Sequence, residues 1–134
     1  MFNFLKKLLS SPKKPYIRLG LSPADEQTVK NKWAEIEELV KLGNPSRFKT
    51  AVLEADKLLD FILKKLSYQG QNLGERMKAI PREKYSREFF NDMWEAHKVR
   101  NEIVHNVGYE IHSAVVQDVV NKFKRVIKTL GINL

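Results

Sequence analysis

The residues best suited to carry chemistry lie together in one short segment, WEAHKVRNEIVHN, residues 94–106. Arg100 is followed directly by Asn101, and four residues separate Arg100 from His105. A planar guanidinium can hold a phosphate through two hydrogen bonds, an imidazole can move protons near neutral pH, and an amide can orient either group. These residue types predict proton transfer at a phosphate whose developing charge is stabilised by Arg100.

Helix geometry limits how this segment can act. Five steps of about 100° leave Arg100 and His105 roughly 140° apart around a straight helix, so the two side chains do not share a face. Gly108, three residues after His105, permits the helix to end there. We therefore expect His105 near a helix end, where it serves either the site or the negative end of its own helix dipole.

Arg100 needs a partner, because an arginine beside an apolar helical stripe is costly to bury unless a carboxylate pairs with it. An internal ion pair is therefore the structural alternative to a role in binding. The sequence offers three acids for that pair: Glu54, Asp56 and Glu95.

Three further side chains are candidate substrate-binding residues. His97 lies one turn before Arg100, on the same side, and either extends the site or is a hydrogen-bonded core residue. Lys122 and Arg125 belong to a basic cluster near the end of the chain, which either tracks a phosphate backbone or forms a solvated face. The whole cluster consists of Lys122, Lys124, Arg125 and Lys128.

The composition of the 134 residues argues against thiol and metal chemistry. There is no Cys, and the spacing of His97, His105 and His112 fits no familiar zinc pattern. No phosphate-binding loop or dinucleotide fingerprint points to another enzyme class. We expect neither a metal nor a cofactor, and carboxylate-held Mg²⁺ is the one alternative left open.

The elements that position these residues are helices. Apolar residues recur every three or four positions in four long segments, with almost no strand pattern between them. The first begins at the cap Ser22, the second at the cap Ser46, the third at Ser86 and the fourth at the cap Ser113. We expect these helices to end at Gly43, Gly70, about His105 and Gly131, with a short helical turn between Asn72 and Pro81.

These segments predict an all-α protein, an antiparallel up-and-down bundle of four long helices plus a short irregular helical turn. The bundle domain spans residues 22–134, and residues 1–21 form a basic amphipathic N-terminal segment and linker. Trp33 and Trp94 fit apolar stripes and are interpreted as core residues rather than as platforms for base stacking.

The N-terminal segment is distinct in charge. The net charge is +8, from 24 basic and 16 acidic residues, and residues 1–19 hold five of the basic residues and no acid. Residues 1–14 predict a short amphipathic helix or tail that either lies on an anionic membrane surface or caps the domain's own core. Since no apolar run is long enough to span a bilayer or form a secretory signal, we expect a cytoplasmic protein, with peripheral contact at the inner face of the membrane as an option.

The Arg100, Asn101 and His105 pattern, near the end of the third long helix, resembles the catalytic signature of the HEPN (higher eukaryotes and prokaryotes nucleotide-binding) superfamily. That signature is an Arg, four to six residues, then a His, often with a polar residue directly after the Arg. The resemblance covers residues 24–130 as architecture, and its sequence specificity rests on these three residues.

The resemblance implies metal-independent RNA cleavage of a toxin or defence type, in which a ribose 2′-hydroxyl attacks the neighbouring phosphate. Arg100 would then bind the phosphate, His105 would act as acid or base, and Asn101 would position them. Acids on the second helix orient the Arg in some relatives, which makes Glu54 and Asp56 candidate orienting residues. The family also implies a homodimer that joins two motifs in one cleft, and an antitoxin or nucleotidyltransferase partner.

The sequence departs from one branch of this family. Toxins paired with a nucleotidyltransferase carry a modified Tyr two residues after the His, whereas Val107 stands there in this chain and Tyr109 lies two residues further on. Many relatives have kept the fold and lost cleavage. A non-catalytic dimerisation or interaction module, held at a membrane through residues 1–14, and a nucleotide-binding sensor are therefore the alternative functions.

Overall fold

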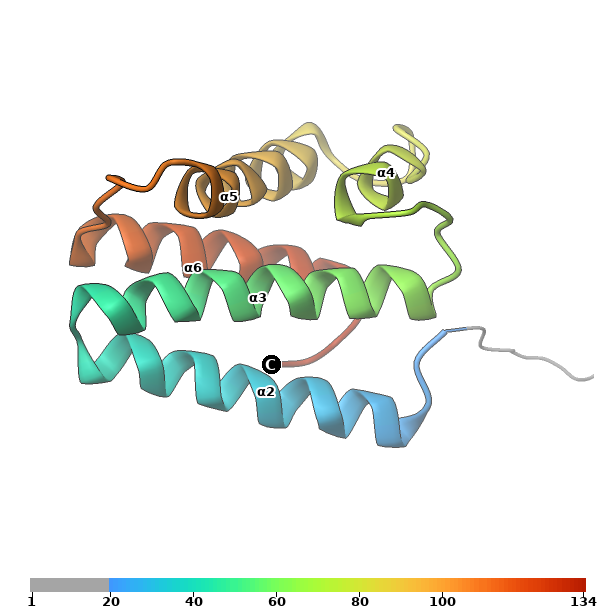
Figure 1. Ribbon diagram of the computed structural model, residues 1–134. Coiled ribbons are helices and arrows are strands. Elements are labelled where there is room, and N and C mark those ends of the chain that lie inside the picture. Colours follow the sequence, from blue (N-terminus) through green and yellow to red (C-terminus); the bar gives the residue numbers. More distant parts are fainter. Residues whose placement is uncertain (1–19) are drawn as a thin grey trace, which may run out of the picture.

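The computed structural model describes residues 20–134, which form a bundle of helices (Figure 1). The predicted amphipathic segment of residues 1–14, with its membrane or core contact, lies outside the described residues. In the described part of the chain there is no strand, and no helix is long and apolar enough to cross a membrane. The helices are α2 (Pro23–Leu42), α3 (Pro45–Lys65), α4 (Leu73–Lys78), α5 (Arg87–His105) and α6 (Ser113–Thr129).

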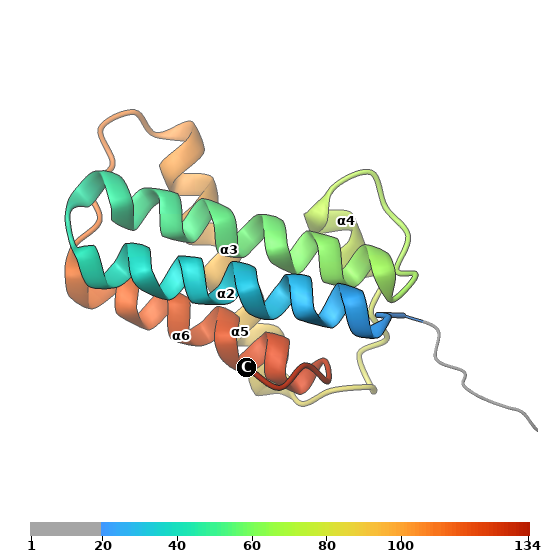
Figure 2. The same ribbon diagram turned by 90° about the horizontal axis from the view of Figure 1, so that it is seen from below.

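The four long helices run in alternating directions along the bundle, and the short α4 lies at the end where α3 finishes (Figure 1). Seen from below, α2 lies in front, between α3 and α6 (Figure 2), and it contacts both of them. The predicted all-α up-and-down architecture with a short irregular helix is therefore confirmed.

Capping residues explain where two helices begin. Ser22 caps α2, since its hydroxyl accepts a hydrogen bond from the Asp25 amide at 3.0 Å and the Asp25 carboxylate accepts one from the Ser22 amide at 3.4 Å. Ser86 caps α5 in the predicted way, with its hydroxyl accepting from the Phe89 amide at 3.1 Å. Both reciprocal and single caps satisfy amides that the first helical turn leaves without partners.

Two predicted caps are wrong. The cap of α3 is Asn44 rather than Ser46, because the Asn44 amide oxygen accepts from the Arg47 amide at 2.9 Å and Pro45 fits the first helical position, where no amide hydrogen is needed. The cap position of α6 is His112, whose side chain makes no capping hydrogen bond, and Ser113 is already helical.

The end of α3 also differs from the prediction at Gly70. The helix stops at Lys65, and Ser67 takes a left-handed conformation with φ of 71° that ends it early. Gly70 instead permits a close approach of the chain to α4. A Cβ at Gly70 would lie 2.8 Å from the backbone nitrogen of Arg76, which is closer than side-chain carbons are found.

Helix α3 is the central element of the bundle, because it contacts α2, α4, α5 and α6. It therefore buries residues over much of its circumference, whereas α2 buries a single stripe of Val29, Trp33 and Ile36. The chain end folds back so that Ile132 joins the same core. The buried residues of α3 are Phe48, Ala51, Val52, Ala55, Asp56, Leu58, Leu59, Ile62 and Leu63.

The central place of α3 predicts that a Leu→Ala substitution lowers the free energy of unfolding much more in α3 than at the exposed end of α2. Leu59 is 0% exposed in α3 and Leu42 is 54% exposed at the end of α2. We expect Leu59→Ala to lower the free energy of unfolding by about 2–5 kcal/mol, through lost burial and the cavity left behind. Leu42→Ala should change it by less than about 1 kcal/mol. Urea denaturation followed by circular dichroism measures both, and equal effects would contradict the central packing of α3.

Candidate functional site

The candidate site is built around a buried carboxylate in the middle of α3. Asp56 is 4% exposed, and its Oδ1 lies 2.9 Å from Nδ1 of His97 on α5. Its second oxygen, Oδ2, lies 3.4 Å from Nε of Arg100, one turn further along α5. One carboxylate from α3 therefore holds two side chains of α5, which share a face because they are three residues apart.

Asn101 extends this arrangement toward solvent. Nη1 of Arg100 donates a hydrogen bond to the Asn101 amide oxygen at 2.9 Å. Asp56 anchors the Arg100 guanidinium through Nε, and the Arg100 side chain is 35% exposed, so a charged hydrogen-bond donor stands at a part-exposed position. We call Asp56, His97, Arg100 and Asn101 the Asp56 cluster.

His105 lies at the end of α5, as expected, and is exposed. Within residues 20–134 its side chain takes part in no hydrogen bond or ion pair, so one chain does not bring His105 into contact with Arg100. Asn101 lies between Arg100 and His105 in angle around the helix axis. Asn101 and His105 are four residues apart and therefore lie within about 40° of each other around the helix. Since the guanidinium bonds to this amide, it reaches toward the side of α5 that carries His105.

The structure shows which of the three candidate acids pairs with Arg100. Asp56 is the partner. Glu54 points to a different neighbour, with its Oε2 3.4 Å from Nζ of Lys57, and it joins the cluster neither directly nor through another side chain. Glu95 pairs with Lys122 of α6 at 3.0 Å. Of the two predicted orienting acids, only Asp56 lies where it can orient Arg100.

His97 occupies a core position, which the sequence analysis gave as the alternative to a role in substrate binding. It is buried and paired with Asp56, as a hydrogen-bonded core residue would be. Its position on the buried stripe of α5 indicates that His97 needs a polar partner, because a buried imidazole requires one, but the stripe does not identify Asp56 as that partner.

Lys122 bonds to acids of two helices. Its Nζ lies 2.7 Å from Asp118 and 3.0 Å from Glu95. The hydrogen bond to Asp118 raises the pKa of Lys122 above its ordinary value, against the smaller opposite effect of burial, and Glu95 adds to the rise. Lys122 thus connects α6 to α5, and its charge is balanced before any phosphate arrives.

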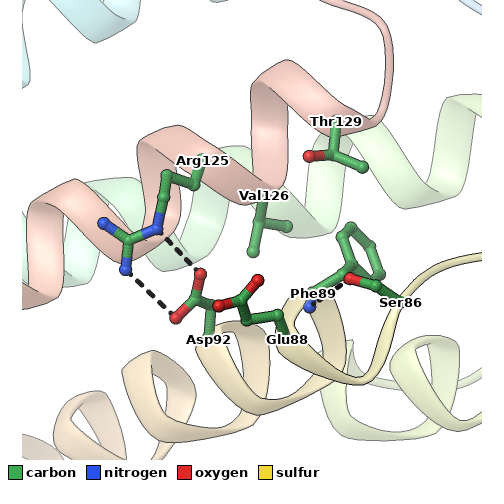
Figure 3. A pocket seen from close by; sticks show the side chains of 7 residues that line it. All are labelled: Ser86, Glu88, Phe89, Asp92, Arg125, Val126 and Thr129. Carbon is green, nitrogen blue, oxygen red and sulfur yellow. Dashed lines mark hydrogen bonds and ion pairs between the residues drawn. The ribbon is translucent and has the colours of Figure 1, made fainter.

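Arg125 forms a two-pronged ion pair with Asp92 across α5 and α6 (Figure 3). Nε lies 2.9 Å from Oδ2 and Nη2 lies 3.1 Å from Oδ1, and this hydrogen bonding raises the pKa of Arg125 above its ordinary value. The pair lines a hollow of about 270 Å³ that also contains Glu88. Two carboxylates against one guanidinium make this hollow unfavourable for a phosphate.

A second hollow, of about 310 Å³, lies beside the Asp56 cluster on α5. Its half-buried Trp94 is a candidate that the sequence interpretation missed, since Trp33 and Trp94 both occupy apolar stripes and only Trp33 is fully buried. The hollow is lined by Trp94, Glu95, His97, Lys98 and Asn101.

Val107 and Tyr109, the two residues compared with the modified tyrosine of the related toxins, differ in exposure. Val107 is 97% exposed, whereas Tyr109 is half-buried against the core. The structure therefore turns Val107, and not Tyr109, toward solvent beside His105. Among residues 20–134 no group of three or more His, Asp or Glu side chains gathers in a way that could hold a metal ion.

Comparisons with protein-family models, curated proteins and solved structures found no match to this chain. The resemblance to the HEPN superfamily therefore rests on the three motif residues and the helical architecture.

The role of Asp56 predicts that two neighbouring acids differ in their contribution to stability. Asp56→Ala would leave the buried His97 nitrogen without its partner and Arg100 without its anchor. We expect the free energy of unfolding to fall by about 1–3 kcal/mol, the cost of an unsatisfied buried polar group. Glu54→Ala, which removes one partly exposed pair, should change it by less than about 0.5 kcal/mol. Urea denaturation of both variants measures the difference, and a neutral Asp56→Ala would contradict the cluster.

Proposed function

We propose that this protein is a HEPN-like, metal-independent endoribonuclease that acts as a homodimer. The observation that carries the proposal is the ion pair and partial exposure of Arg100 in the Arg-x4-His segment. Arg100 is anchored by the buried Asp56, yet its side chain is 35% exposed at the surface of α5. An anchored guanidinium at a part-exposed position is suited to a phosphate whose charge grows during reaction.

The chemistry follows from the residues on this part of α5. The ribose 2′-oxygen attacks the neighbouring phosphorus as its proton leaves, and the bond from phosphorus to the 5′-oxygen breaks. The products are a 2′,3′-cyclic phosphate and a 5′-hydroxyl that has gained a proton. His105 transfers one of these protons, Arg100 stabilises the charged phosphate oxygens, and Asn101 positions the guanidinium.

A second copy of the chain supplies what one chain lacks. Arg100 and His105 do not meet within one protomer, and exposed apolar side chains flank His105 at this end of α5. Val104 is 46% exposed and Val107 is 97% exposed. Large exposed apolar residues of this kind favour an interface, and a two-fold axis here would place two motifs against each other.

The proposal predicts RNA cleavage in EDTA that depends on both motif residues. We expect wild-type protein to leave 2′,3′-cyclic phosphate ends, and Arg100→Ala and His105→Ala each to slow cleavage by roughly 100-fold or more. Electrophoresis of labelled structured and single-stranded RNAs measures the rates. Arg125→Ala is the matched control, because Arg125 is already paired with Asp92, and it should cleave at close to the wild-type rate.

All variants should keep wild-type helical content and mass in solution. RNA binding that requires Arg100 without any cleavage would favour the non-catalytic module or the nucleotide sensor instead. Absence of both binding and cleavage would remove the proposal.

The homodimer predicts that a charge beside His105 separates the subunits. Val107→Glu should leave the fold unchanged, since this side chain is exposed, and should convert dimer to monomer with loss of cleavage. Ala79→Glu places the same charge on an exposed residue after α4, at the opposite end of the bundle, and should remain dimeric. Light scattering coupled to size exclusion measures the mass, and a dimer that persists in Val107→Glu would refute this interface.

A further inference from the structure

The hollow beside the Asp56 cluster is a surface feature that the cleavage chemistry does not use. Its volume of about 310 Å³ lies at the lower limit of small-molecule sites, which is suited to one nucleotide unit rather than to a duplex. The hollow continues from the candidate site, because Asn101 lines it and also accepts the hydrogen bond from Arg100.

Trp94 gives the hollow an aromatic wall that packs against a buried neighbour. Its ring meets the His97 ring edge-on, with centroids 6.1 Å apart and planes at 75°. His97 is itself held by Asp56, so the indole packs against a neighbour that does not move freely. Trp33 differs, because it is buried and its indole nitrogen donates to Glu37 at 2.9 Å.

The charges of the lining favour an anionic ligand. Lys98 takes part in no ion pair or side-chain hydrogen bond within residues 20–134, and its side chain is exposed. Glu95, the acid of the lining, is engaged by Lys122. The hollow therefore offers an aromatic side chain, an available ammonium and an amide, with Arg100 bonded to that amide.

We propose that Trp94 stacks on a base of a single-stranded RNA, in the nucleotide adjoining the phosphate bound by Arg100, while Lys98 pairs with the phosphate of that nucleotide. Six residues of helix place Trp94 about 9 Å from Arg100 along the axis. Stacking requires an open base face, which duplex RNA does not present, so the substrate class is unpaired RNA. This inference rests on the proposed RNA-directed function and assigns its specificity to a residue outside the motif.

The test measures how much of the binding depends on bases. A short single-stranded 2′-fluoro oligonucleotide, which lacks the attacking hydroxyl, is compared with an abasic oligonucleotide of the same length and phosphate count. Fluorescence anisotropy gives the affinity of each for wild type, Trp94→Leu and Trp94→Phe. Both substitutions keep an apolar side chain at a half-buried position, and only Phe keeps a ring.

We expect wild type to bind the base-bearing oligonucleotide roughly tenfold more tightly than the abasic one. Trp94→Leu should lose this difference without changing the affinity for the abasic oligonucleotide, and Trp94→Phe should keep most of it. Phe61→Ala is the matched control, because Phe61 is a half-buried aromatic residue that lines a different hollow, of about 200 Å³, with Glu54 and Lys57. It should bind both oligonucleotides like wild type.

Contact with Trp94 is measured directly in a Trp33→Phe background, where Trp94 is the only tryptophan. The base-bearing oligonucleotide should quench its fluorescence and the abasic one should not. Adenosine monophosphate is the third probe, and it should bind more weakly than the oligonucleotide. Equal affinity for the mononucleotide would overturn the assignment to an RNA strand.

Two results separate failure of this inference from failure of the proposed function. If binding and cleavage depend on Arg100 but Trp94→Leu binds both oligonucleotides like wild type, or weakens both equally, only the stacking assignment is wrong. If Arg100→Ala binds the oligonucleotides as tightly as wild type, the proposed function is wrong and the stacking assignment falls with it.

Discussion

A buried carboxylate needs charged or hydrogen-bonding partners, and Asp56 finds both of its partners on one helix. His97 and Arg100 lie one turn apart on α5, and each contacts a different oxygen of Asp56. Only one rotation of α5 about its axis can bring both side chains to α3 at once. The burial of Asp56 therefore fixes which residues α5 turns inward and which it leaves at the surface, and the candidate site depends on that choice.

Helix α5 divides into two parts with different roles. Its first half anchors the helix in the core through Phe89, Phe90 and Met93. Beyond Trp94 two polar side chains, His97 and Arg100, also turn toward the bundle, where they meet Asp56. Apolar packing continues there through Ala96, Val99 and Ile103, whereas Val104 is exposed although it continues the apolar spacing. The groups that can do chemistry thus stand on a rigid helix whose other half is firmly packed, which limits the entropy lost when a ligand binds.

The basic cluster on α6 suggested a free positive face for a phosphate backbone, but three of its side chains are paired with acids. Lys122, Lys124 and Arg125 all pair with acids of neighbouring helices, so they join α6 to α2 and α5. These pairs are partly exposed and contribute modestly to stability, but they neutralise the positive face of α6. On α5, Lys98 lines the hollow and the side chain of Arg100 nearby is 35% exposed, so both positive charges lie close to it.

The sequence by itself determined the number, order and approximate limits of the helices, because apolar periodicity, prolines and caps such as Ser22 and Ser86 are local signals. The predictions from the sequence were wrong for the caps Ser46 and Ser113 and for the end of α3, because several neighbouring residues could cap or end a helix at these places. Only the tertiary structure decided that Asp56 partners Arg100, that Lys122 and Arg125 are already paired, and that Trp94 is partly open while Trp33 is not. Each of these depends on how helices distant in sequence rotate and pack against one another, and residue spacing along one helix carries no information about its neighbours.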